Sequence, residues 1–177
     1  LRIFERGHRI EDAMVGWLRA AGFILKTEGK DGQQFGFSVA DGKLQGHCDG
    51  VFVGGPEGFA YPALWECKAL GNKSWTDLVK KGLVVSKPVY AAQVAIYQTY
   101  LALYDNPAIF TAVNADSMEI YTELVPFDAA LAQKMSDRAV RVITATEAGE
   151  LLPRSFAQAD HFECRFCSYA ERCWGGA

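Results

Sequence analysis

Two short apolar runs organise this chain: Gly46-His47-Cys48-Asp49-Gly50-Val51-Phe52-Val53 and Tyr61-Pro62-Ala63-Leu64-Trp65-Glu66-Cys67-Lys68. A Gly/Pro-rich turn separates them, which predicts a β-hairpin. Because strand side chains alternate between faces, we expect Asp49 to share a face with His47, Glu66 to share one with Lys68, and Cys48 and Cys67 to point away. Charged side chains are rare in a buried strand unless they are paired or bind a metal. The hairpin therefore predicts a functional site.

The composition is that of an ordinary globular domain. The chain has 177 residues, 50% hydrophobic and 22% charged, with a formal net charge of −3, enough for one domain with its own core. Nucleic-acid binding would therefore need a local basic patch. No apolar run approaches the roughly 20 residues of a membrane span, so we expect no membrane partner. Three of the five cysteines fall in the last fourteen residues, which indicates a metal site in a reducing, cytoplasmic setting rather than disulfides.

Hydrophobic periodicity and turn residues predict a single domain over residues 1–177, in the order α-β-β-β-β-α-β-β-α, with a Cys-rich tail at 152–177. We expect long helices over 5–21, 89–104 and 126–146, the last with Asp128 as its N-cap, and one or two helical turns over 75–79. The expected strands are 23–28, 34–39, 44–53, 64–70, 108–113 and 118–125.

The two carboxylates of the hairpin suit a divalent cation. Asp49 and Glu66 offer oxygen ligands, and Mg²⁺ needs few protein carboxylates because it keeps waters in its shell. Lys68, on the face of Glu66, would orient or deprotonate a metal-bound water or stabilise charge on a phosphate. This chemistry is phosphodiester hydrolysis. The plainer alternative is a salt bridge on a surface hairpin.

Four segments and the tail together resemble a known superfamily. The segments are Gly7-His8-Arg9-Ile10-Glu11, Gly46-His47-Cys48-Asp49-Gly50, Glu66-Cys67-Lys68 and Gln93-Val94-Ala95-Ile96-Tyr97, and the tail is Cys164-x2-Cys167-x5-Cys173. In this order and spacing they resemble the PD-(D/E)XK nucleases, and among them the RecB-like and phage-type exonucleases. A lone E-x-K occurs by chance in many proteins, but the combination spans residues 7 to 173.

The resemblance implies an α/β restriction-endonuclease-like core, with a central mixed sheet of about five strands flanked by helices. It also implies an Mg²⁺- or Mn²⁺-dependent deoxyribonuclease, an exonuclease rather than a sequence-specific endonuclease, which processes DNA ends in recombination, repair or phage replication and works beside a recombination or annealing protein. The implied metal ligands are Asp49, Glu66, the carbonyl of Cys67, and Glu11 or His8; Lys68 is the implied catalytic lysine, and Gln93 and Tyr97 position DNA or that lysine.

Plainer interpretations stand beside these roles. Glu11 is favoured over His8, but Glu11 is also compatible with a solvated helix face and His8 with a capping or surface residue. His47 either joins the site or hydrogen-bonds the turn. Gln93 and Tyr97 would equally suit a buried helix face with a satisfied amide.

The cysteine tail predicts a structural metal site. The resemblance implies an iron–sulfur cluster at Cys164, Cys167 and Cys173, but metal sites generally have four ligands. The iron–sulfur relatives supply the fourth cysteine near the N-terminus, whereas no cysteine precedes Cys48 in this sequence. His161 lies three residues before Cys164, so a Cys3His zinc site is the alternative.

A basic connection follows the second strand of the hairpin. Its lysines would meet a phosphate backbone, and its tryptophan would stack on a base or pack beneath the loop; these residues are Lys73, Trp75, Lys80, Lys81 and Lys87. A solvated loop is the alternative. For the whole chain, the other functional classes are a catalytically silent nucleic-acid-binding module, a metal-stabilised interaction module, and an RNA-cleaving enzyme with the same site.

Overall fold

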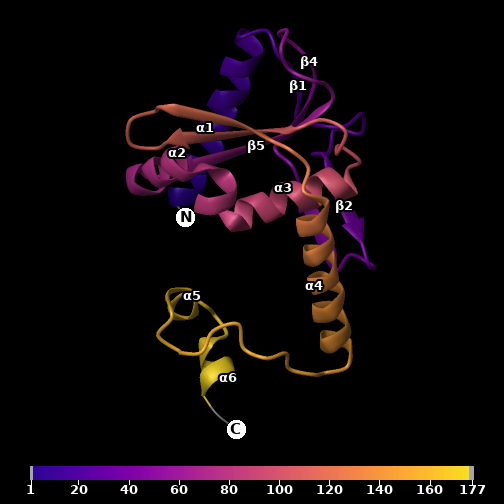
Figure 1. Cartoon of the computed structure of the whole chain (residues 1–177), viewed down its shortest axis with the longest axis vertical. Coiled ribbons are helices and arrows are strands. Elements are labelled where there is room, and N and C mark those ends of the chain that lie inside the picture. Colours follow the sequence, from indigo (N-terminus) through magenta and orange to yellow (C-terminus); the bar gives the residue numbers. More distant parts are fainter. Residues whose placement is uncertain (1, 176–177) are drawn as a thin grey trace. The chain divides into compact units, whose positions relative to one another are not determined.

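The computed structural model describes residues 2–175, which form two compact units (Figure 1). The units divide between Arg138 and Ala139, inside helix α4 (Ala129–Glu147). The second unit therefore begins earlier than the Cys-rich tail expected from residue 152. No helix in the described part of the chain is both long and apolar enough to cross a membrane.

The first unit is built on a five-stranded mixed sheet, as the sequence predicted. The strand order is β1-β4-β5-β6-β7, in which β5 and β6 run parallel and the other neighbours run antiparallel. The strands are β1 (Ile24–Lys26), β4 (Gly50–Gly54), β5 (Ala63–Leu70), β6 (Ala108–Asn114) and β7 (Ile120–Val125). A separate two-stranded sheet holds β2 (Gly36–Val39) and β3 (Leu44–His47).

The single strand predicted over 44–53 is wrong, because the chain changes sheets within it. The N–H of Cys48 still bonds the carbonyl of Phe35, on the side of the small sheet, whereas Gly50 pairs with Trp65 of β5. A Cβ at Gly50 would lie 2.8 Å from Leu25 Cδ1 and 2.9 Å from the backbone of Lys26. Glycine therefore permits the close approach at which the chain enters the large sheet, and Asp49 lies in the bend rather than in a strand.

One helix packs on one face of the sheet and two on the other. Helix α1 (Arg2–Ala20) contributes to the core cluster of β5 and β6 residues that contains Trp65 and Cys67. Helices α2 (Asn72–Ser86) and α3 (Pro88–Tyr100) contribute to the cluster that contains Leu64, Leu70 and Phe110. Alternate residues of β5 thus belong to opposite faces. Cys48 packs in the second of these clusters, so the expectation that it points away from the face of Glu66 is wrong.

Backbone hydrogen bonds explain where two of the helices end. After α1, Gly22 has φ 91°, and the N–H of Phe23 bonds the carbonyl of Leu18, which is the Schellman pattern. Helix α3 ends at Tyr100 rather than at the predicted residue 104, since Ala102 has φ 53° and the N–H of Leu103 bonds the carbonyl of Gln98. At α4, Leu131 donates its N–H to Asp128 Oδ1 at 2.8 Å, which confirms the predicted N-cap.

Helix α2 is much longer than the one or two turns predicted over 75–79. It starts at Asn72, whose N–H bonds Asp116 Oδ2 at 2.8 Å, and it kinks at Gly82, which has φ 74° and ψ 170°. The kink leaves the N–H of Leu83 without a helical partner, and Glu123 Oε2 on β7 accepts it at 2.8 Å. Carboxylates distant in sequence therefore stabilise a helix that a local pattern does not predict.

The second unit contains two short helices, α5 (Phe162–Arg165) and α6 (Ala170–Trp174), that the sequence did not predict. His161 caps α5, because its Nδ1 accepts the N–H of Glu163 at 3.3 Å. Arg154 holds α6: its Nε donates to the carbonyl of Cys173 at 2.9 Å, and its guanidinium lies 4.6 Å from the ring centroid of Trp174.

Candidate active site

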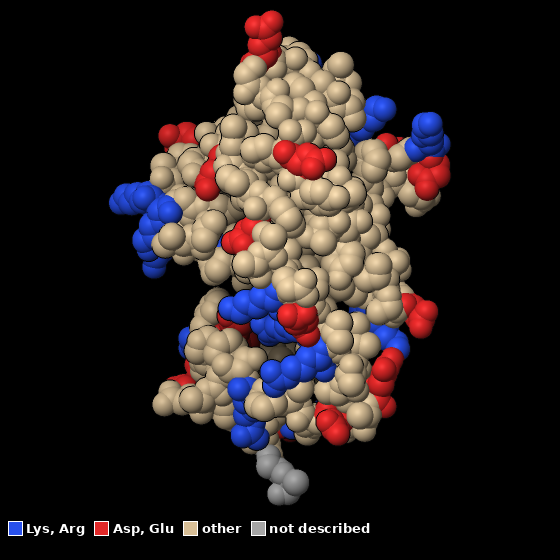
Figure 2. Space-filling model, turned by 45° about the vertical axis from the view of Figure 1, so that its right-hand side comes forward, with Lys and Arg blue, Asp and Glu red and all other residues tan. Residues whose placement is uncertain are grey.

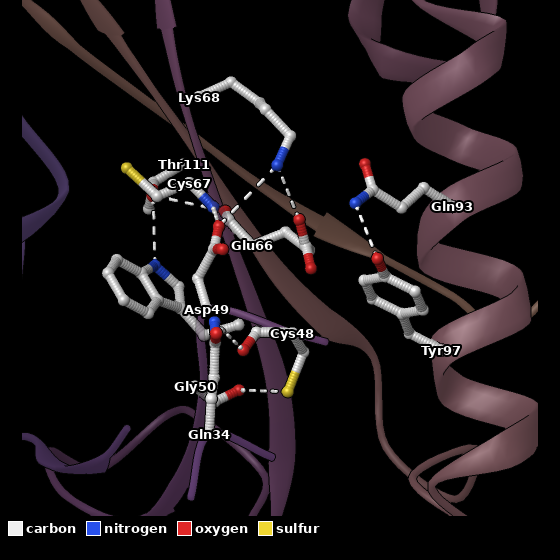
Figure 3. Close-up of polar contacts among 11 residues, drawn as sticks. Gln34, Cys48, Asp49, Gly50, Glu66, Cys67, Lys68, Gln93, Tyr97 and Thr111 are labelled. Atoms are coloured by element: carbon white, nitrogen blue, oxygen red, sulfur yellow. Dashed lines mark hydrogen bonds and ion pairs between the residues drawn. The ribbon is translucent and has the colours of Figure 1, made fainter. Parts of the chain in front are cut away.

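Asp49 occupies a notch where two strands of the large sheet separate. The ladder between β4 and β5 ends at the pair Gly50–Trp65, so the next N–H of β5 on that side needs another acceptor. Asp49 Oδ2 accepts the N–H of Cys67 at 2.7 Å (Figure 3). The bend before β4 thus fixes the Asp49 carboxylate beside the second half of β5.

Glu66 and Lys68 project from β5 on one face, as the strand alternation predicted. Lys68 Nζ lies 2.7 Å from Glu66 Oε2 and 3.6 Å from Asp49 Oδ2. The Glu66 side chain is 1% exposed and that of Lys68 20% exposed. The structure therefore brings Asp49, Glu66 and Lys68 together, with the ammonium group bound by both carboxylates.

Burial and the neighbouring charges together set the protonation of this cluster. Burial first, and then the charge of Asp49, raise the pKa of Glu66, which reaches about 8 against the opposing effect of Lys68. Burial alone would lower the pKa of Lys68, but the charges of Glu66 and Asp49 outweigh it, so that the pKa of Lys68 is raised. Glu66 Oε1 is buried and has no hydrogen-bond partner among the described residues.

Glu11 reaches the cluster from α1. Its side chain is half-buried, and together with Gln34 and Asp49 it lines a pocket of about 500 Å³. Burial, and then the charge of Asp49, raise the pKa of Glu11, whereas the nearby charge of His8 opposes this rise. His8 itself is exposed. The structure thus places Glu11 beside the carboxylates and His8 at the surface near Glu11.

His47 lies outside this arrangement. It is the exposed last residue of β3, and its ring covers Gly36 of β2, where an added Cβ would collide with His47 Cδ2. The prediction that His47 and Asp49 share a strand face is wrong, because Asp49 belongs to the bend that follows β3.

Gln93 and Tyr97 lie one turn apart on α3. Gln93 Nε2 donates to Tyr97 Oη at 3.0 Å, and Figure 3 draws this pair on the helix beside the carboxylate cluster. Burial raises the pKa of Tyr97, and the charges of Glu66, Lys68 and Asp49 also act on it. Gly46 makes room for the ring, since an added Cβ would lie 2.5 Å from Tyr97 Cε1.

Tyr90 is a neighbour of the cluster that sequence reasoning missed. The Nζ atom of Lys68 lies 5.7 Å from the centroid of its ring. The signal was present in the spacing Tyr90-x2-Gln93-x3-Tyr97, because residues three and seven apart share one face of a helix.

The donor set at the notch fits a cation that prefers oxygen. Two carboxylates converge, one of them has a buried oxygen without a partner, and the positive Lys68 ammonium already lies against both. Oxygen ligands of this kind suit Mg²⁺. Within residues 2–175, no group of three or more His, Cys, Asp or Glu side chains is placed so as to hold a metal ion.

Known proteins resemble this chain in structure but not detectably in sequence. No protein-family model and no curated protein matches the chain by sequence. The structure is similar to the crystal structure of an alkaline exonuclease (LHK-Exo) from Laribacter hongkongensis, with a TM-score of 0.59 and 19% identity over 82% of this chain and 69% of that one. The fold is similar to an exonuclease fold. A crystal structure of SSO0001 matches with a TM-score of 0.49 and 15% identity over 93% of this chain and 66% of that one.

The lysines expected in a loop after β5 lie on α2 and at its end. Three of them line one pocket of about 600 Å³ together with Ser74, Thr76 and Asp77; they are Lys73, Lys80 and Lys87. Asp77 pairs with two of the lysines, since Lys81 Nζ lies 2.6 Å from its Oδ1 and Lys87 Nζ lies 3.7 Å from its Oδ2. Trp75 packs against the core, where its Nε1 donates to the carbonyl of Ala112 at 3.3 Å. On the face drawn in Figure 2, basic and acidic side chains are interspersed.

All five cysteines are free thiols. Burial raises the pKa of Cys48 and of Cys67 to about 12 each, so both thiols stay protonated near neutral pH. The three tail cysteines, Cys164, Cys167 and Cys173, line one pocket of about 220 Å³ without a metal-holding arrangement among the described residues. His161 stacks on Phe156, with ring centroids 3.8 Å apart.

Proposed function

We propose that this chain is a divalent-metal-dependent deoxyribonuclease, and that it acts as an exonuclease on DNA ends. The observation that carries the proposal is the convergence of Asp49, Glu66 and Lys68 in the notch between β4 and β5, with a buried Glu66 oxygen that lacks a partner. The likeness to an alkaline exonuclease structure supports the fold on which such a site would work.

Asp49 and Glu66 would hold Mg²⁺ or Mn²⁺ through their carboxylate oxygens, with the carbonyl of Cys67 and the carboxylate of Glu11 as further candidate ligands. When bound, such a cation supplies positive charge for the phosphodiester transition state and makes water more acidic. Asp49 is already fixed by the N–H of Cys67, so its position does not depend on the ion.

Lys68 lies next to the carboxylates. Although burial alone would lower the pKa of Lys68, the charges of Glu66 and Asp49 raise it in the metal-free chain, which favours a role as a positive charge and hydrogen-bond donor. It would orient the attacking water and stabilise negative charge on the phosphate oxygens. Gln93 and Tyr97 would position the strand beside it from α3.

DNA would meet the chain through its backbone phosphates. Lys73, Lys80 and Lys87 share a pocket on α2, and lysine is a common phosphate ligand. Lys81 and Lys87 both form ion pairs with Asp77, and Trp75 packs against the core. We therefore propose Lys73 and Lys80 as the main phosphate contacts, with Lys81, Lys87 and Trp75 in supporting roles.

The second unit would hold a structural metal at Cys164, Cys167 and Cys173. Because His161 uses Nδ1 to cap α5, only its Nε2 remains as a ligand for a zinc site; the alternative is an iron–sulfur cluster. Metal analysis and the visible absorbance of protein purified without oxygen would separate zinc, iron and no metal.

Cleavage of end-labelled single- and double-stranded DNA, with Mg²⁺, Mn²⁺ or EDTA, tests the nuclease. Asp49→Asn is the sharpest variant, since asparagine keeps an acceptor for the N–H of Cys67 but removes the charge. Lys134→Ala, at an exposed residue of α4, is the control. We expect metal-dependent release of labelled nucleotides by the wild type and by the control, and a loss of at least about 100-fold in Asp49→Asn. If the folded wild type cleaves no DNA in the presence of metal, the nuclease proposal is refuted, and a nucleic-acid-binding module remains as the alternative.

A further inference from the structure

Tyr90 lies in the first turn of α3, with its ring against the lysine of the candidate site. The Lys68 Nζ atom is 5.7 Å from the ring centroid, inside the roughly 6 Å within which a cation is attracted to the face of an aromatic ring. The two carboxylates bind the same ammonium group from β5 and from the bend before β4. Lys68 therefore contacts two acidic side chains and one aromatic ring.

The ring is held in place from the sheet and from its own helix. It stacks on Phe110 of β6, with centroids 6.4 Å apart and planes at 28°, and Phe110 is completely buried. The N–H of Tyr90 bonds the carbonyl of Lys87 at 2.9 Å, and Pro88 fixes the start of the helix. Tyr90 is thus anchored independently of Lys68.

The register of the sheet leaves room for this contact. Glu66 is paired with Phe110, and Lys68 with Ala112. The side chain beside Lys68 therefore ends at Cβ, whereas the side chain beside Glu66 is a full aromatic ring. The Lys68 chain can extend over the alanine toward the ring that Phe110 supports.

We propose that Tyr90 is a positioning residue that holds the Lys68 ammonium from its ring face while the carboxylates bind a metal ion. This inference rests on the proposed nuclease function. A divalent cation at Asp49 and Glu66 would take up part of the negative charge that now holds the lysine, but the ring carries no net charge and would keep its attraction. The face of the ring, and not the hydroxyl, performs this role.

The contact itself can be measured without any cleavage. Protein labelled with ¹³C-lysine, with Lys68 assigned through Lys68→Arg, gives the chemical shift of the Lys68 ε-methylene group in EDTA and in Mg²⁺. We expect an upfield ring-current shift relative to the other lysines, kept in Tyr90→Phe and lost in Tyr90→Leu. A Lys68 shift that is the same in wild type and Tyr90→Leu would overturn the inference, whether or not the protein is a nuclease.

Kinetics then test the role in the reaction. In saturating Mg²⁺ we expect Tyr90→Phe to keep the wild-type kcat and Tyr90→Leu to lower kcat by about two- to thirtyfold, with KM for DNA within about twofold. Tyr104→Leu, at an exposed tyrosine after α3, controls for loss of an aromatic ring. Equal kcat in Tyr90→Phe and Tyr90→Leu would reduce Tyr90 to core packing, and a wild type that does not cleave would refute the nuclease while the chemical-shift result stands.

Discussion

Glu66 should make the metal-free protein less stable as the pH rises, and Glu66→Gln should remove this effect. The ordinary pKa of 4.5 is raised to about 8 in the folded chain. Between these values the unfolded chain has lost the Glu66 proton while the folded chain keeps it, so the free energy of unfolding falls by up to about 1.4 kcal/mol per pH unit. From pH 5 to pH 8 the loss is about 3.5 kcal/mol.

Lys68 does not contribute to this slope. Its ordinary pKa is 10.5 and its folded pKa is higher, so its stabilising effect is fully present below pH 10.5 and is lost only as the pH rises beyond that range. Glu66→Gln keeps the size of the side chain and an acceptor for Lys68. The difference between wild type and variant therefore isolates the Glu66 proton.

Urea unfolding in EDTA at pH 5, 6, 7 and 8 measures this difference. Tryptophan fluorescence reports mainly on the first unit, which contains three of the four tryptophans, Trp17, Trp65 and Trp75. We expect the wild type to lose about 3.5 kcal/mol relative to Glu66→Gln across the series. Parallel pH profiles of the two proteins would show that Glu66 is already ionised in the folded state, and that its burial does not raise its pKa.

Three further expectations follow from the geometry. Mg²⁺ at millimolar concentration should raise the melting temperature, measured by differential scanning fluorimetry, of the wild type but not of Asp49→Asn. An equal rise in both proteins would show that the stabilising ion binds somewhere other than the notch. Gly46→Ala should destabilise the first unit by about 1–3 kcal/mol and weaken cleavage, because the added Cβ would displace the ring of Tyr97; unchanged urea midpoints would show that the ring moves freely. Asp128→Ala should cost about 1 kcal/mol through the lost cap on Leu131 and leave cleavage unchanged, so a large loss of activity would contradict a purely local role.

The strand pattern was the most predictable part of the chain. The alternation around Glu66 and Lys68, and the glycine and proline turns, are local signals, and they predicted the strands and the face shared by these two residues, whereas the mixed sheet was implied by the family resemblance. The interruption at Cys48 and Asp49 was not predictable in this way. Alternation continues through these residues in the sequence. The strand is divided there only because the segment before them pairs with β2 and the segment after them pairs with β5.

The prediction of the helix after β5 failed for a related reason. Its lysines and glycine resemble a polar loop, and the groups that stabilise it, Asp116 at its start and Glu123 at the kink, come from β7 and the turn before it. Local propensity contains no information about such caps. Tyr90 was only partly predictable. Its spacing from Gln93 and Tyr97 is visible in the sequence, but nothing in that spacing shows that the ring lies over Lys68.

The alternation of β5 makes the length of the hairpin a critical property. Odd-numbered residues such as Trp65 and Cys67 pack toward α1, and even-numbered ones such as Glu66 and Lys68 face α3. One residue inserted or deleted within the strand would exchange these sets, so that the Glu66 carboxylate would enter the apolar cluster under α1 and the Trp65 indole would take its place beside Asp49. Changes of length in this hairpin should therefore be tolerated only in the turn at residues 55–62, where they leave the parity of β5 intact.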